Sequence, residues 1–146
     1  MLVDFRRESW LESASAVTLW ELGLPVPTPQ VVVLDAWDRF VGRVDVGWLD
    51  QGVVGEIDGR VKYDAALNGS AEAARRRLVA EKVREDRLRD LGLEVVRWGY
   101  QDLSQPHELA QRVVRALARG DRHRFRGRFV VAQDRQIGFR PVTPTL

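Results

Sequence analysis

Three carboxylates lie inside a stretch that otherwise has the pattern of two short strands and a tight turn, RVDVGWLDQGVVGEIDGRVKY (residues 43–63). They are Asp45, Glu56 and Asp58. Acids are uncommon in strands that pack on a core, because burying an unpaired charge is costly. Their spacing therefore raises the question of what these acids face.

The predicted register of this hairpin brings two of the acids together. If Asp50 and Gln51 form the turn, Asp45 faces Glu56, on the same side of the sheet. Facing side chains have Cβ atoms about 5 Å apart, and like charges there are destabilising. The pair therefore needs a proton, a basic partner or a divalent cation. One or two carboxylates, with water and phosphate oxygens, form a usual Mg²⁺ site, as in metal-dependent phosphodiester hydrolysis.

A simpler interpretation of the same residues stays open. Arg43 would face Asp58 and could pair with it, while Asp45 and Glu56 could point to solvent on an exposed face. A shift of one residue in the register would also separate the two acids. The spacing alone does not decide between a metal site and a solvated hairpin.

The elements around the hairpin follow from hydrophobic periodicity and turn residues. They predict helices at 4–22, 71–91 and 106–119 and strands at 31–37, 40–49, 53–58 and 93–100. This order, α-β-β-β-α-β-α, predicts an α/β fold with helices on the faces of a mixed sheet. Residues 1–120 would form this domain. Residues 121–146 would be a basic C-terminal tail, either a flexible arm or an added strand through RFVVA (128–132).

Composition excludes several classes of site. The chain has 146 residues, which suits one domain, and no cysteine, which excludes disulfides, thiol nucleophiles and thiolate zinc sites. No apolar run is long enough to cross a bilayer, and we expect a cytoplasmic protein. Basic residues comprise 21 arginines and two lysines, Lys62 and Lys82. Arginine suits phosphate recognition, but a GC-rich genome would produce the same bias.

Two further groups of residues have a structural and a functional interpretation. Arg84 falls within the apolar arc expected on the 71–91 helix, formed by Ala80, Val83, Leu88 and Leu91. A buried arginine needs an acidic partner, so Arg84 would form a structural ion pair, with Asp58 or Glu81, or would steady carboxylates or a phosphate. The five tryptophans, Trp10, Trp20, Trp37, Trp48 and Trp98, are expected mainly in the core.

The hairpin, together with EKVREDRLRDLGLEVVRWGYQDL (81–103), resembles the restriction-endonuclease-like PD-(D/E)xK nucleases. It is most similar to very-short-patch-repair-like endonuclease domains of bacterial, notably actinobacterial, proteins. The resemblance covers residues 8–118. Its most specific parts are the hairpin and an R-x3-L-x3-G-x2-V-x-R pattern on Arg84, Leu88, Gly92, Val95 and Arg97. It implies a restriction-endonuclease-like mixed sheet flanked by helices.

The resemblance also implies roles for individual residues. Asp45 and Glu56 match the two strand acids that bind metal, and Glu8 matches an acid of the first helix that completes the metal shell. Asp58 stands where the superfamily pattern has a lysine. Lys62, or Lys82, would then supply the missing basic group that activates water.

The implied function is Mg²⁺- or Mn²⁺-dependent DNA hydrolysis. Asp45, Glu56, Asp58 and Lys62 would be catalytic, and a separate set of basic residues would contact DNA: Arg75, Arg76, Lys82 and Arg84. A homodimer, or the N-terminal winged-helix segment that precedes this domain in related proteins, would be a further partner; without that segment, the chain would be a fragment or a stand-alone version. The alternative is an inactive nucleic-acid-binding or toxin–antitoxin-type interaction module on the same fold, which the acid at position 58 favours.

Overall fold

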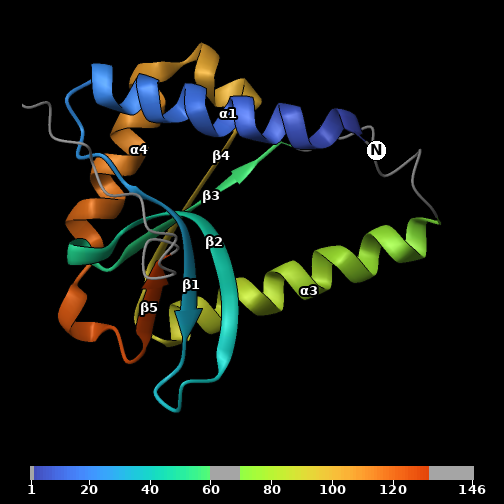
Figure 1. Ribbon diagram of the computed structural model, residues 1–146, viewed down its shortest axis with the longest axis vertical. Helices are drawn as coiled ribbons and strands as arrows, with labels where there is room; N and C mark the ends of the chain where they lie inside the picture. The colour runs from blue at the N-terminus through green and yellow to red at the C-terminus, as the bar shows by residue number, and fades with distance from the viewer. Residues whose placement is uncertain (1, 60–69, 132–146) are drawn as a thin grey trace, which may run out of the picture.

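The computed structural model describes residues 2–59 and 70–131, with the backbone alone for residues 2–9 (Figure 1). In this part of the chain the elements follow in the order α1 (Leu2–Glu21), β1 (Thr28–Leu34), β2 (Phe40–Trp48), β3 (Val53–Asp58), α3 (Ala71–Asp90), β4 (Glu94–Gly99), α4 (Pro106–Arg119) and β5 (Arg128–Val131). The predicted α/β class, with a mixed sheet flanked by helices, is confirmed. A fifth strand is added to the predicted four.

The five strands form one sheet in the order β4-β3-β2-β1-β5. Strand β2 runs antiparallel to both β1 and β3, and β5 runs antiparallel to β1. The crossover through α3 makes β4 parallel to β3. The tail of the chain thus includes a strand of the sheet, which is one of the two forms considered for it.

The β2–β3 hairpin has the predicted register over its paired part. Val46 pairs with Gly55 and Trp48 with Val53, around a 3-10 turn at Leu49–Gln51. Beyond Val46 and Gly55 the two strands separate: β2 continues along β1, and β3 continues along β4. We call this point, marked by Asp45 and Glu56, the strand fork. Figure 1 shows the divergence, with the start of β2 at the lower end of the molecule and β3 directed toward α1.

The core consists of two clusters. Helices α1 and α4 lie together over one part of the sheet (Figure 1) and cover a cluster that includes Trp48, Trp98, Leu109 and Val113. Within it, the indole Nε1 of Trp98 donates a hydrogen bond of 2.8 Å to the hydroxyl of Ser15 in α1. The second cluster joins β1 and β2 to the C-terminal end of α3 through Leu88 and to Phe125. The sheet is thus anchored to helices on both sides of the strand fork.

Helix α3 contacts the sheet through its C-terminal half. Leu88 is its buried residue, while Val83 is 53% exposed and Ala80 is also exposed. The predicted apolar arc is therefore wrong for Ala80 and Val83. The N-terminal part of α3 extends away from the sheet, as Figure 1 shows, and Ala80 and Val83 lie where no other described element covers the helix.

The prediction for the tryptophans is also partly wrong. Trp48 and Trp98 are core residues, but Trp10, Trp20 and Trp37 are more than half exposed. In the described parts of the chain, no helix has the length and apolar content needed to cross a membrane.

Candidate functional site

The two acids at the strand fork have different surroundings. Asp45 is half-buried, and its Oδ2 accepts a hydrogen bond of 2.7 Å from the backbone amide of Ile57. This bond spans the gap where β2 leaves β3. Glu56 is only 7% exposed and lies beside Arg97 in the β3–β4 register. The fork therefore places one partly accessible and one buried carboxyl side by side.

Helix α3 supplies the basic partner of Glu56. The guanidinium of Arg84 forms an ion pair with Glu56, and it also pairs with Glu81 at 3.1 Å. A third contact, at 3.2 Å, is a hydrogen bond from Arg84 to the backbone carbonyl of Arg43 in β2. Arg84 thus bridges the two separating strands from the side of α3.

Close approach of Arg84 to β2 depends on Gly42. A Cβ atom at Gly42 would lie 3.2 Å from Cδ of Arg84. Such a distance is tighter than ordinary van der Waals contact between carbon atoms. The absent side chain at position 42 therefore makes room for the arginine.

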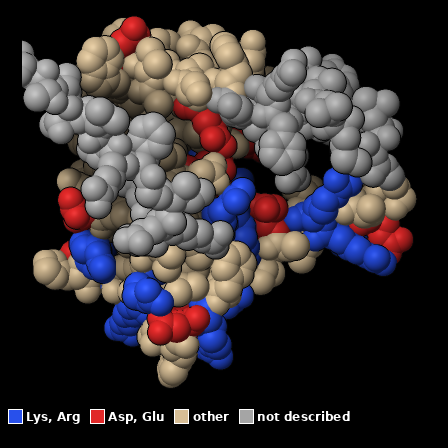
Figure 2. Space-filling view, viewed as in Figure 1, with Lys and Arg blue, Asp and Glu red and all other residues tan. Residues whose placement is uncertain are grey.

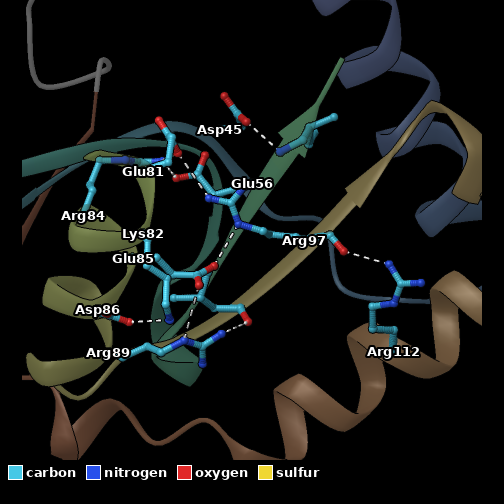
Figure 3. A network of polar contacts seen from close by, with 12 residues as sticks. Asp45, Glu56, Glu81, Lys82, Arg84, Glu85, Asp86, Arg89, Arg97 and Arg112 are labelled. Carbon is cyan, nitrogen blue, oxygen red and sulfur yellow. Dashed lines mark hydrogen bonds and ion pairs between the residues drawn. The ribbon is translucent and has the colours of Figure 1, made fainter. Parts of the chain in front are cut away.

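Further charges of alternating sign extend this group along α3 and β4 (Figure 3). Arg97 donates a hydrogen bond of 2.8 Å to Glu85 and pairs with Glu81 at 3.2 Å. Glu85 is also 3.9 Å from Arg89. Figure 3 shows Glu56 between Arg84 and Arg97, with Asp45 at the edge of the group.

Burial decides the charge state of Glu56. Removal from water raises the pKa of its carboxyl from 4.5 to about 7. The ion pair with Arg84 opposes this rise, whereas the negative charge of Asp45 adds to it. Burial therefore favours the protonated form of this carboxyl up to a higher pH than for an exposed glutamate.

The acid pair was expected to need a proton, a basic partner or a divalent cation. The structure contains the basic partner, which is Arg84. The suggested ion pair between Arg84 and Glu81 is confirmed, while the ion pair with Glu56 was not predicted. Sequence reasoning also missed Arg97 and Glu85 as members of this group. The available signal was the parallel β3–β4 register, which places Arg97 next to Glu56.

Other predicted site residues lie at different distances from the fork. Asp58 is exposed at the end of β3, two residues beyond Glu56 and paired in register with Gly99. Glu8 belongs to α1, which contacts β3, but its side chain is outside the described part. Lys62 is also outside the described residues. The roles of Glu8 and Lys62 stay predictions.

The predicted DNA-contacting residues all belong to α3. Arg75 and Arg76 are exposed on its projecting half, where Arg76 pairs with Glu72 at 3.1 Å. Lys82 is exposed and pairs with Asp86 at 3.0 Å. These side chains are accessible to a polyanion, unlike Arg84, which is mostly buried in its ion pairs.

The candidate ligands for a divalent cation are the carboxyl oxygens of the strand fork. In residues 2–59 and 70–131, no set of three or more histidine, aspartate or glutamate side chains is arranged to hold a metal ion. Asp45 and Glu56 remain as a pair. Oδ1 of Asp45 accepts no hydrogen bond from a described residue, and the buried Oε1 of Glu56 makes the Arg84 ion pair without a well-directed hydrogen bond.

Comparison of the chain with protein-family models, with curated proteins and with solved structures finds no match in any of the three. The function is therefore argued from the site itself.

Proposed function

We propose that the chain is a divalent-metal-dependent DNA endonuclease of the PD-(D/E)xK type, on a restriction-endonuclease-like form of its α/β fold. The observation that carries the proposal is the buried carboxyl of Glu56 beside Asp45, with a pKa of about 7. Burying an acid so that its pKa rises to near neutral pH lowers the stability of the fold. Such shifted pKa values are therefore found mainly where a function requires them. The sequence resemblance supports the same assignment.

The carboxyl pair fits Mg²⁺ or Mn²⁺. A hard cation of this kind takes oxygen ligands and is often held by one or two carboxylates, with water and phosphate oxygens completing its shell. Asp45 offers Oδ1, and Glu56 offers a carboxyl whose negative form a cation would favour over its protonated form. A bound cation would supply a polarised phosphodiester and a more acidic water.

The residues of the chain would divide the work as follows. Asp45 and Glu56 would hold the cation, and Glu8 of α1 would be the third carboxylate. Arg84 holds the Glu56 carboxyl in place from α3. Asp58 lies two residues along β3. Lys62 would supply the cationic group that Asp58 does not. The exposed arginines of α3, Arg75 and Arg76 among them, contact the phosphate backbone, since guanidinium groups pair with phosphate oxygens.

The alternative function also has a specific observation in its favour. Arg84 pairs with Glu56, so the buried carboxyl has a basic partner that belongs to the chain itself. An inactive DNA-binding or toxin–antitoxin-type interaction module would keep this ion pair as a purely structural element. The two functions differ in one measurable property, the binding of metal at the fork.

Metal binding is tested by thermal unfolding in EDTA and in millimolar Mg²⁺ or Mn²⁺, because a ligand that binds the native state alone raises Tm. We expect a rise of a few degrees for the native chain. Asp45→Asn, which can keep the hydrogen bond to Ile57, and Glu56→Gln should each remove it. Glu85→Gln is the matched control, since it changes an acid of the same ion-pair group away from Asp45. An unchanged Tm in the native chain would favour the alternative function.

Catalysis is tested by nicking of supercoiled plasmid with the same four proteins. The native chain and Glu85→Gln should nick DNA in Mg²⁺ or Mn²⁺ and not in EDTA. Glu56→Gln should lose more than the roughly 10–100-fold in rate that follows loss of a residue supporting a metal ligand, since Glu56 would be a ligand itself. Cleavage by Glu56→Gln at the native rate would exclude the proposed site.

A further inference from the structure

The β1–β2 connection, taken as residues 35–40 from the loop to the first residue of β2, carries two large aromatic side chains in solvent. Trp37 is 75% exposed and Phe40 is 63% exposed, although neither is part of the strand fork. The guanidinium of Arg39 stacks over the Trp37 ring at 5.0 Å from its centroid. We call this loop, together with the facing start of β5 at Arg128, the hairpin tip. Exposed apolar surface bordered by polar residues is a feature of binding sites.

Internal hydrogen bonds fix the backbone of the hairpin tip. The buried carboxylate of Asp35 accepts hydrogen bonds from the backbone amides of Trp37 and Arg39, at 2.9 and 3.0 Å, and from Nε of Arg39 at 2.8 Å. Asp38 takes the left-handed conformation that completes the turn. The exposed rings therefore project from an ordered turn, which limits the entropy lost when they bind a partner.

The two arginines of the hairpin tip are balanced by Asp35 and Asp38, and an excess of positive charge comes from the segment before β5. Arg128 at the start of β5 pairs with Asp38 at 3.0 Å, which ties the edge strand to the tip. The segment that precedes β5 in the chain adds three exposed arginines, Arg122, Arg124 and Arg126. Figure 2 shows lysine and arginine side chains around a small acidic patch at the lower end of this face, the end at which Figure 1 shows the β1–β2 hairpin.

Flat apolar rings bordered by arginines match one class of partner, a nucleic acid with accessible bases. Bases stack on aromatic side chains whatever their sequence, and arginines take the phosphates between them. Rings on a convex tip reach bases that are already unpaired, whereas entry into a duplex would first require base pairs to unstack. An acidic protein surface would use the arginines but would gain little from exposed tryptophan.

We propose that the hairpin tip is a binding site for unpaired DNA, in which Trp37 and Phe40 stack on bases and Arg39 and Arg128 contact the backbone. DNA binding at the tip does not depend on the proposed nuclease function, but the role of the bound DNA as a substrate does. It would make the substrate a DNA with a single-stranded or flapped segment, held at the tip while a phosphodiester lies at the fork.

The test is a fluorescence anisotropy titration of a short fluorescein-labelled oligothymidylate in EDTA at low salt. We expect the native chain to bind it more tightly than a blunt duplex of the same length. Trp37→Ala should weaken this binding at least about fivefold, the lower range for loss of one base–aromatic stack, and Trp37→Phe should keep most of it. Arg128→Gln should reduce the dependence of affinity on salt.

Trp20→Ala is the matched control, because Trp20 is 67% exposed but lies in α1, remote from the tip. Its affinity should equal that of the native chain. Equal affinity of Trp37→Ala and the native chain, an equal loss in Trp20→Ala, tighter binding of the duplex, or no binding of either DNA would each overturn the inference. Thermal unfolding of each variant shows that the fold is intact. All titrations contain EDTA, so their outcome is independent of metal-dependent nicking.

Discussion

At the scale of single residues, Glu56 carries a carboxyl that burial makes hard to ionise. The pKa of a glutamate in the unfolded chain is near 4.5, and in the folded chain that of Glu56 is about 7. Between these values the folded state binds a proton that the unfolded state has lost, so stability falls as pH rises. Because one pKa unit corresponds to about 1.4 kcal/mol, the cost above pH 7 is about 3 kcal/mol.

The first prediction follows from this sign. The glutamine of Glu56→Gln does not ionise, so the free energy of unfolding of this variant should not fall in this way as pH rises. Relative to the native chain, the variant should gain about 2–3 kcal/mol in free energy of unfolding between pH 5 and pH 8. Urea unfolding at several pH values measures the difference. The variant that loses metal binding would then be the more stable protein at pH 8.

A second variant gives the opposite sign. Burial opposes ionisation of Glu81, but its ion pairs with Arg84 and Arg97 outweigh burial and lower its pKa. The stability that Glu81 contributes is present above the ordinary glutamate pKa and is lost as pH falls. Glu81→Gln should therefore differ most from the native chain at neutral pH and least in acid. Parallel pH curves for the native chain and both variants would contradict this account.

The sequence could predict the pairing of these residues only where it depended on local geometry. The turn at Leu49–Gln51 sets the hairpin register, and the predicted register agrees with the observed one. The ion pair between Arg84 and Glu56 depends instead on how α3 returns across the sheet after β3. Helical periodicity identified Arg84 as facing inward, but no periodicity gives the distance between a helix and a strand.

At the scale of elements, α3 is held on the sheet by a small number of contacts near its C-terminal half. Leu88 is buried in the core cluster, and Arg84 reaches Glu56 and the carbonyl of Arg43. Gly42 of β2 leaves the space that Arg84 occupies. The position of α3, and of the arginines it presents, therefore depends on whether Arg84 fits against β2.

The third prediction tests this fit. Gly42→Val should destabilise the protein by about 1–3 kcal/mol, because the added side chain collides with Cδ of Arg84. In an Arg84→Ala background the same substitution should cost much less, since the colliding group is gone. Urea unfolding of the four proteins gives the coupling energy between the two positions. Additive effects would show that Gly42 and Arg84 act independently.

Element boundaries were close to the predicted ones, but the environment of each element was harder to infer. The strand at Val53–Asp58 and the helix at Pro106–Arg119 have the predicted limits. The exposure of Val83 and Trp37 was not foreseen, because an apolar residue with the correct periodicity is buried only if another element covers it. Coverage is a property of the tertiary arrangement, and a single sequence carries little information about it.

At the scale of the whole molecule, the sheet is extended at one edge by a strand from the end of the described chain. Strand β5 pairs with β1 from Val31 to Leu34 and so satisfies backbone groups that an edge strand leaves open. Phe129 of β5 stacks on the buried Phe125 at a centroid distance of 4.3 Å. Residues 121–131 therefore contribute to the same sheet and core as the strands of the fork.

The last prediction concerns this edge. A chain that ends at Gly127 lacks β5, whereas one that ends at Val131 keeps it. Compared with the longer chain, the shorter one should lose roughly 2 kcal/mol, the scale expected for removing an aromatic contact and strand pairing, and should melt roughly 5 °C lower. Its exposed β1 edge should also promote association, visible by light scattering at raised concentration. Equal melting temperatures and equal scattering would mean that β5 adds nothing to the sheet. Since Arg128 also pairs with Asp38, the shorter chain should bind oligothymidylate less tightly as well, which connects the sheet edge to the hairpin tip.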